Sequence, residues 1–168
     1  IGYLAQQTQV QKDFPSSVEE VVLSGFVGHL EHRWFYNKKE KELAKEYMAK
    51  TGVDKLAKHC YRDLSGGQQQ RTLLARALCA ADKMILLDEP AAGMNPKETE
   101  DLMNTIKLIR DKFGIAVLLI EHDMKLVLGI CERLVVLNYG KILASGKPND
   151  VINNPQVVEA YLGKEEDE

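Results

Sequence analysis

Residues 64–90 have the sequence LSGGQQQRTLLARALCAADKMILLDEP, and this stretch is the most informative part of the chain for predicting the fold. The run starts with a serine and two glycines at the expected beginning of a helix. It continues into four consecutive apolar residues, 84–87, which end at two carboxylates. A strand without polar alternation is typical of a parallel sheet that is covered on both faces. The stretch therefore predicts an α/β fold.

The helix start at Ser65-Gly66-Gly67 is a candidate anion site. Free backbone N–H groups and the helix dipole favour negative charge there, and two residues without side chains allow a phosphate to approach closely. The same three residues, seen alone, are often only a helix cap. These three residues therefore predict an anion site only in combination with a second motif.

The second site is the pair Asp88-Glu89, which directly follows the apolar strand. α/β proteins place ligands at the carboxyl ends of their strands. One carboxylate can hold Mg²⁺, and the next can orient or deprotonate a water molecule. Two carboxylates that only mark the end of a strand, without a function, are the alternative interpretation. Its occurrence one helix length after the glycine pair favours the functional interpretation.

Outward from this stretch, the sequence predicts elements on both sides. Residues 1–5 form a short apolar strand, and a second apolar run at 115–120 predicts another covered strand. Residues 134–137 and 141–143 are typical of a hairpin. The first predicted helix begins after Ser17, which has capping-box spacing to Glu20. Another predicted helix ends at Gly114. The remaining predicted helices cover residues 38–50, 65–81, 124–130 and 157–162. The pattern indicates an α/β sheet with a helical insertion.

Composition narrows the class of protein. Hydrophobic residues make up 45% and charged residues 28% of the 168 residues, as in ordinary globular proteins. The net charge of −3 gives no electrostatic reason to expect a nucleic-acid partner. Three cysteines without tight spacing suit a reducing compartment, and the longest aliphatic run is far below the roughly 20 residues of a membrane span. We therefore expect a cytosolic protein and, because the chain begins at Ile1 without a methionine, a piece of a longer one.

Five motifs in order resemble those of the ABC ATPase family. LSGGQQQR is similar to the signature motif and MILLDEP to the Walker B motif, while Gln6 matches the Q-loop, residues 91–96 the D-loop and His122 the H-loop. The resemblance covers essentially the whole chain. It implies an incomplete P-loop NTPase fold, ABC/RecA-like, with a mostly parallel sheet. A single domain over residues 1–168 would then contain a helical sub-domain at about 7–80 and a catalytic core at 1–6 and 81–168.

The resemblance also implies roles for residues around the chain's own ATP. Asp88 would bind Mg²⁺, and Glu89 would be the catalytic base. His122 would hydrogen-bond the γ-phosphate, and Gln6 would help to place both Mg²⁺ and the attacking water.

A second group would act on ATP held by another subunit. Ser65, Gly66, Gly67 and Gln68 would contact the γ-phosphate of a nucleotide bound to the opposite subunit of a dimer. Asn95 would cross the dimer interface, although many relatives have Asp at that position. ATP and Mg²⁺ are therefore the implied cofactors, and a second nucleotide-binding domain is an implied partner.

One family motif is missing. No G-x-x-x-x-G-K-[S/T] loop occurs in the chain, and in the family this loop would lie before Ile1. Its N–H groups and lysine supply most of the contacts that neutralise the phosphates. We therefore predict that the chain alone does not hydrolyse ATP. Loss of the strand that leads into this loop would leave sheet edges unpaired, so that the chain dimerises through them, rearranges its sheet or needs a complementary fragment.

The two halves of the chain resemble different importers. Residues 1–90 are similar to zinc/manganese-type importer ATPases, and residues from 91 onward to branched-chain amino-acid importer ATPases, so a natural mosaic and an engineered chimera both fit. The implied function is coupling of ATP hydrolysis to import of a metal ion or an amino acid, at the inner face of the cell membrane. Alternatives are a non-transport ABC protein of translation or DNA repair and an inert interaction module.

The helical part implies transmembrane permease subunits as further partners. It resembles the sub-domain that docks onto them, and Phe14, Pro15 and the aromatic cluster Trp34-Phe35-Tyr36 are candidate contacts. Packing of these aromatic side chains in the helical core is the alternative interpretation, and it applies above all to Trp34.

Overall fold

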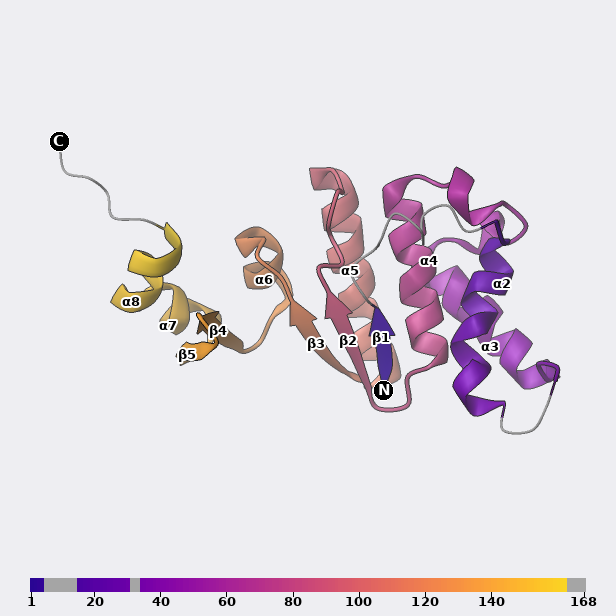
Figure 1. The fold of residues 1–168 in the computed structure, drawn as a ribbon, viewed down its shortest axis with the longest axis horizontal. Helices are drawn as coiled ribbons and strands as arrows, with labels where there is room; N and C mark the ends of the chain where they lie inside the picture. The colour runs from indigo at the N-terminus through magenta and orange to yellow at the C-terminus, as the bar shows by residue number, and fades with distance from the viewer. Residues whose placement is uncertain (5–14, 31–33, 163–168) are drawn as a thin grey trace. The chain divides into compact units, whose positions relative to one another are not determined.

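A computed structural model describes residues 1–4, 15–30 and 34–162 of the chain. It contains two compact units, residues 1–126 and residues 127–168, which are drawn in Figure 1 and described separately below. Gln6 and Phe14 lie outside the described residues. Among the helices of the described part, none is long and apolar enough to cross a bilayer.

The first unit contains a parallel sheet of three strands. These are β1 (Gly2–Leu4), β2 (Met84–Asp88) and β3 (Ala116–Ile120), hydrogen-bonded in the order β1-β2-β3. Leu4 pairs with Leu87, and Asp88 pairs with Ile120. All three strands therefore end at the same edge of the sheet, and the parallel pairing of β2 with β3 is the one that their apolar runs predicted.

The two faces of the sheet differ in burial. Ile85 and Leu87 of β2 are buried, and α4 (Gly66–Cys79) packs against β1 so closely that a side chain on Gly2 would overlap the Ala77 carbonyl oxygen. Leu118 and Ile120 of β3 are each about half exposed. The prediction that β3 is covered on both faces is wrong for the described residues, because its alternate side chains are about half exposed there.

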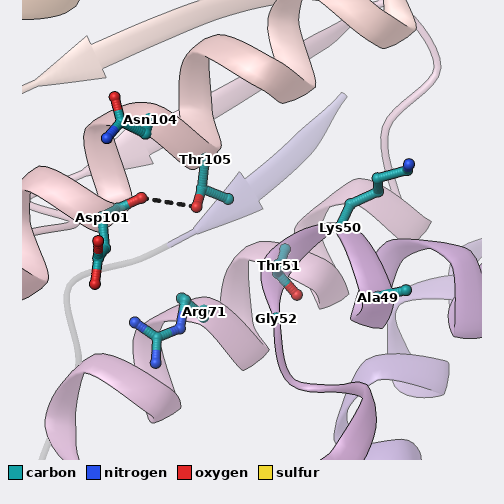
Figure 2. Close-up of a pocket in the computed structure, with 8 residues that line it drawn as sticks. All are labelled: Ala49, Lys50, Thr51, Gly52, Arg71, Asp101, Asn104 and Thr105. Atoms are coloured by element: carbon teal, nitrogen blue, oxygen red, sulfur yellow. Dashed lines mark hydrogen bonds between the residues drawn. The ribbon is translucent and has the colours of Figure 1, made fainter.

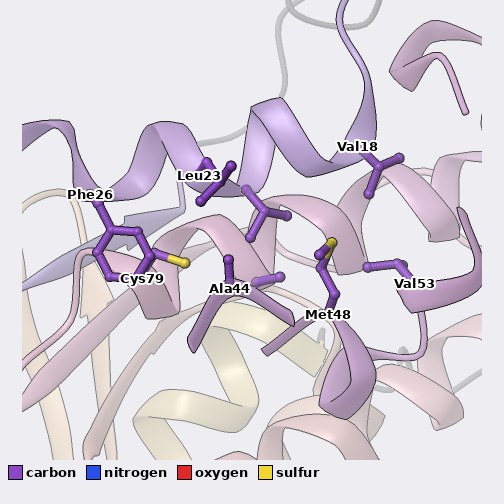
Figure 3. Packing of buried hydrophobic residues seen from close by; sticks show 9 residues of the cluster. Val18, Leu23, Phe26, Ala44, Met48, Val53 and Cys79 are labelled. Atoms are coloured by element: carbon purple, nitrogen blue, oxygen red, sulfur yellow. The ribbon is translucent and has the colours of Figure 1, made fainter. Parts of the chain in front are cut away.

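Three helices form a separate apolar core beside the sheet. They are α2 (Val18–Leu23), α3 (Lys38–Thr51) and α4, joined by 3-10 turns at Ser24–His29, Asp54–Leu56 and Tyr61–Asp63. Figure 3 shows their buried side chains meeting at one place. We call this the helical cluster, and it consists of Val18, Val22, Leu23, Phe26, Ala44, Met48, Val53, Ala75 and Cys79.

Sequence rules explain where these helices start. Ser17 and Glu20 form the predicted capping box at α2, and Asn37 and Glu40 form an equivalent one at α3. Each box satisfies two backbone N–H groups that a helix start leaves unpaired. At its other end, α3 stops at Gly52, whose φ of 71° favours glycine.

The exposed aromatic residues lie between the turn at Ser24–His29 and α3. Trp34 is 92% exposed and Phe35 is almost as exposed, whereas Tyr36 packs against the helical cluster. Core packing is therefore correct for Tyr36 and wrong for Trp34. Pro15 is also exposed.

Helix α5 (Pro96–Phe113) connects β2 to β3. Leu102, Ile106 and Ile109 form its buried stripe, as their spacing predicted, and Gly114 ends it with φ of 60°. The ring of Phe113 meets Tyr47 of α3 edge-on, with centroids 5.2 Å apart. This contact joins the sheet-forming part of the first unit to its helical part.

The second unit is a hairpin with short helices. Helix α6 (Met124–Ile130) leads into it, and β4 (Leu134–Asn138) pairs antiparallel with β5 (Lys141–Gly146). Tyr139 and Gly140 both have positive φ, 46° and 75°, as a two-residue hairpin turn requires. The chain continues through α7 (Pro148–Ile152), α8 (Pro155–Val157) and a π-helical turn at Val158–Leu162. The predicted hairpin and last helix are present, and α7 was not predicted.

Candidate functional site

The ends of β2 and β3 bring Asp88, Glu89 and His122 to one edge of the sheet. The two strands are in register up to Asp88 and Ile120. Beyond this pair, the Glu89 N–H donates to the Ile120 carbonyl oxygen over 2.9 Å. The loop that follows β2 therefore begins against the end of β3, which is where the predicted histidine motif starts.

Glu89 has an unusual backbone conformation. Its φ is 44°, in the left-handed region that residues with side chains rarely adopt. Such a conformation costs on the order of 1–3 kcal/mol and persists where surrounding bonds hold it. Here it turns the chain sharply at the strand end, so that the Glu89 carboxylate leaves the line of the strand.

The Glu89 carboxylate meets the His122 imidazole. Glu89 Oε1 lies 3.5 Å from His122 Nδ1, with the glutamate side chain 30% and the histidine side chain 76% exposed. An acid and an imidazole at this separation, both reachable by solvent, can exchange or share a proton with a bound water. The structure thus joins two residues that the sequence separates by 33 positions.

Asp88 occupies the end of the central strand. Its Oδ2 accepts a hydrogen bond from the Tyr3 hydroxyl of β1 at 3.4 Å. Mg²⁺ is commonly held by one or two carboxylates together with substrate phosphates and water. Asp88 fits such a cation as a single ligand, and the described residues contain no cluster of three or more metal-binding side chains.

The start of α4 is organised by its own capping box. Ser65 Oγ accepts from the Gln68 N–H at 3.3 Å, and Gln68 Oε1 accepts from the Ser65 N–H at 2.9 Å. The Ser65 and Gln68 side chains therefore each accept a hydrogen bond from the backbone N–H of the other residue across the first turn. Neither the Gly66 nor the Gly67 N–H takes part in this box.

The start of α5 lies next to the start of α4. Asn95 caps α5 and forms a capping box with Glu98, with bonds of 3.0 and 3.1 Å. A methyl group added to Gly67 would lie 2.7 Å from Glu98 Oε1. Glycine at position 67 thus has a reason within the chain itself, since the Glu98 carboxylate packs against it.

Glu98 was not predicted as part of a site, although its spacing from Asn95 matches a capping box. Glu121 was also missed. Its side chain is only 2% exposed, and it accepts hydrogen bonds from the backbone N–H groups of Ala91, His122 and Asp123. No sequence signal distinguished this buried glutamate from the exposed ones.

The predicted residues fall into two groups within the described part of the chain. Asp88, Glu89 and His122 lie together at the sheet edge. The signature residues 65–68 and Asn95 lie together where α4 and α5 begin. Gln6, predicted to join the first group, lies outside the described residues.

A groove of about 310 Å³ lies away from both groups (Figure 2). It is formed by the end of α3, by Arg71 of α4 and by one face of α5. On that face, the Thr105 hydroxyl donates to the Asp101 carbonyl oxygen at 2.8 Å. Of the predicted catalytic and nucleotide-binding residues that the structure describes, none lines this groove.

Comparison with protein families gives two matches. Residues 1–92 match the family described as ABC transporter. Residues 141–167 match the family described as branched-chain amino acid ATP-binding cassette transporter. The two matches cover the predicted signature and Walker B motifs and the C-terminal end.

Comparison with individual proteins also finds ATP-binding proteins of transport systems. The chain is 43% identical over 123 residues to the high-affinity branched-chain amino acid transport ATP-binding protein BraF of Pseudomonas aeruginosa, which covers 73% of the chain and 48% of BraF. It is 34% identical over 166 residues to the lipopolysaccharide export system ATP-binding protein LptB of Haemophilus influenzae, covering 98% of the chain and 66% of LptB. The chain spans about half the length of BraF-like relatives.

A solved ATP-binding cassette of an ABC transporter, in its ADP conformation, has the same fold. It superimposes with a TM-score of 0.80 at 29% identity, over 97% of this chain and 68% of the cassette. The mixed α/β architecture with a parallel sheet and helices is therefore that of such cassettes.

Proposed function

Because the chain belongs to the ABC transporter family, we propose that its protein is the ATP-hydrolysing subunit of an importer of branched-chain amino acids. The observation that carries the ATPase part is the 3.5 Å approach of Glu89 Oε1 to His122 Nδ1, beside Asp88 at the same strand ends. The rest of the proposal follows from what these side chains can do together.

Glu89 is the proposed general base. Its carboxylate is partly exposed and its backbone turns it out of the sheet, so it can accept a proton from a water molecule at the sheet edge. His122, more exposed still, would donate a hydrogen bond to an anionic phosphate oxygen. Asp88 would hold Mg²⁺, and bound Mg–ATP would supply the electrophilic phosphorus and the cation that offsets its charge.

The second group of residues is proposed to act on a nucleotide of a partner subunit. The start of α4 offers a helix dipole and two glycines, which favour an anion there. Asn95 lies beside that helix start, so residues 65–68 and Asn95 would face the same partner. A second nucleotide-binding domain is therefore the proposed partner for this surface.

The transported substrate is proposed from the relatives. BraF and LivG of Escherichia coli, both 43% identical, are named for branched-chain amino acid transport. The family matched by residues 141–167 carries the same description. These similarities favour an amino acid over the metal ion that the first half of the sequence also suggested.

The exposed side chains of Trp34 and Phe35 are proposed contacts to a transmembrane permease. Large apolar side chains left in solvent at one loop are typical of interaction sites. A subunit docked in this way would lie at the inner face of the membrane.

Hydrolysis is best tested in a chain that also carries a phosphate-binding loop. A segment that contains a G-x-x-x-x-G-K-[S/T] loop would be joined before Ile1, and phosphate release from Mg–ATP would be measured. The proposal predicts hydrolysis that Glu89→Gln lowers by at least about 100-fold, since the proton acceptor is lost. Equal rates for the two proteins, with equal thermal stability, would contradict the role of Glu89.

The substrate is tested separately. The joined protein would be reconstituted in vesicles with a permease for branched-chain amino acids, and uptake of leucine and of Zn²⁺ would be compared. ATP-dependent leucine uptake supports the proposal, and Zn²⁺ uptake alone would overturn the choice of substrate while leaving the ATPase assignment intact.

A further inference from the structure

We propose that Glu121 is a positioning residue. Its side chain bonds to both the loop after β2 and the histidine motif, and so keeps Glu89 and His122 in position relative to each other. Glu121 directly follows β3, and its carboxylate reaches back to the loop that begins at Glu89. Its Oε1 accepts the Ala91 N–H at 3.1 Å, and its Oε2 accepts the His122 N–H at 3.1 Å. One buried side chain therefore bonds to both functional loops.

The burial of Glu121 separates its role from that of Glu89. The Glu121 side chain is 2% exposed, whereas that of Glu89 is 30% exposed. A general base must reach the water from which it takes a proton. Glu89 meets that condition and Glu121 does not, although both carboxylates lie near the same imidazole, with His122 Nδ1 3.5 Å from Glu89 and 3.9 Å from Glu121.

The backbone bonds explain how a carboxylate can be buried there. A third N–H, that of Asp123, approaches Glu121 Oε2 at 3.4 Å. Hydrogen bonds to an ionised acceptor are roughly twice as strong as those between neutral groups. Removal of the carboxylate would leave the part-buried Ala91 N–H without this acceptor and would release the His122 N–H from the loop after β3.

Hydrogen bonds to the end of β3 fix both ends of the short segment from Glu89 to Ala91, and Glu121 supplies the acceptor at the Ala91 end. The Glu89 N–H donates to the Ile120 carbonyl oxygen, and two residues later the Ala91 N–H donates to the Glu121 side chain. Both acceptors belong to consecutive residues at the end of β3. The left-handed conformation of Glu89 lies between these two anchors, so the side chain of Glu121 helps to hold the turn that directs the Glu89 carboxylate.

Amide hydrogen exchange in the 168-residue chain tests the structural part of this proposal. Glu121→Ala is expected to raise exchange at the Ala91 and His122 amides by at least about 10-fold, while amides of the helical cluster change by less than about 2-fold. Glu121→Gln, which keeps an acceptor oxygen, is expected to restore part of the protection. Glu100→Ala, which removes an exposed carboxylate on α5, is the matched control and is expected to change neither loop. Unchanged exchange at Ala91 and His122 in Glu121→Ala would overturn the proposal.

The catalytic consequence rests on the proposed function and is measured in the protein joined to the phosphate-binding loop. Glu121→Ala is expected to lower kcat by about 10–100-fold with little change in KM for ATP, and Glu121→Gln to recover at least about 5-fold of that loss. A rise in KM alone would contradict a positioning role. If the unsubstituted joined protein does not hydrolyse ATP but the exchange results are as expected, the proposed function fails and the structural role of Glu121 stands.

Discussion

The helical cluster and the three-stranded sheet bury their apolar residues in different ways. Met48 and Val22 of the helical cluster are almost completely buried among three helices. Leu118 of β3 is 52% exposed on a sheet whose other face is covered. The difference shows that the helical cluster is closed to solvent, whereas one face of β3 is partly open to it. The candidate catalytic edge of the sheet is held by strand pairing and by the polar contacts of Glu121.

The largest expected effect tests this contrast in stability. Met48→Ala removes a buried side chain and is expected to lower the free energy of unfolding by about 2–5 kcal/mol, because lost burial and the remaining cavity add. Leu118→Ala, the matched change on the open face, is expected to cost less than about 1 kcal/mol. Urea unfolding followed by circular dichroism measures both. Equal losses would show that the exposed face of β3 is covered in solution.

A smaller effect is expected where the two regions meet, at the starts of α4 and α5. Asn95→Ala removes the cap of α5 and is expected to cost about 1 kcal/mol. The loss would appear as a lower midpoint in the same urea experiment. Asn104→Ala, the same change at an exposed position of the same helix, serves as the control and is expected to have less effect. An Asn95→Ala protein as stable as the unsubstituted chain would show that the capping box contributes nothing.

Gly67→Ala tests the contact between those helix starts directly. The added methyl group would meet the Glu98 carboxylate, which must move, so we expect a cost of about 1 kcal/mol. In Gly67→Ala combined with Glu98→Ala, the combined loss should be smaller than the sum of the two single losses, because the clash is gone. Strict additivity would exclude the close packing of Glu98 on Gly67.

A pH dependence of stability is expected to originate in the helical cluster. Burial raises the pKa of the Cys79 thiol to about 12. Above a pH of about 8.5, where an unfolded cysteine ionises, the unfolded chain loses a proton that the folded chain keeps, so stability falls as pH rises. Cys79→Ala should flatten the pH dependence of the urea midpoint between about pH 8 and 10. An unchanged slope would show that Cys79 does not contribute to it.

The sequence predicted the fold well where local signals are strong. Apolar runs gave the parallel strands, and capping boxes such as Ser17 with Glu20 marked helix starts. Gly114 marked the end of α5 because a left-handed terminal residue favours glycine. The exposure of β3 was not predictable, since an apolar run does not reveal which of its faces lacks a packing partner.

The candidate site was predictable in part. Asp88 ends a strand, Glu89 and His122 come just after strands, and parallel strands end at a common edge, so their approach follows from the topology. Glu121 could not be singled out, because its burial and its bond to Ala91 depend on tertiary structure. Gln6 lies outside the described residues, so its predicted role stays a prediction.

The absence of a G-x-x-x-x-G-K-[S/T] loop from these 168 residues makes a further prediction possible. The chain by itself should release no phosphate from Mg–ATP above the background of Glu89→Gln, because it lacks the lysine and the N–H groups that neutralise the phosphates. A phosphate-release assay on the purified chain measures this. An ATPase rate that disappears in Glu89→Gln would contradict it.

The central claim is that Glu89 and His122 act together as one catalytic unit at the ends of β2 and β3. A double-mutant cycle tests this claim most directly. In the protein joined to a phosphate-binding loop, kcat would be measured for Glu89→Gln, His122→Ala and the combination of both. If the two side chains act together, the combined protein should be no more than about 10-fold slower than the slower single variant, since residues that act as a unit are strongly non-additive. Losses that multiply fully would show that the two residues act independently, and would contradict the account.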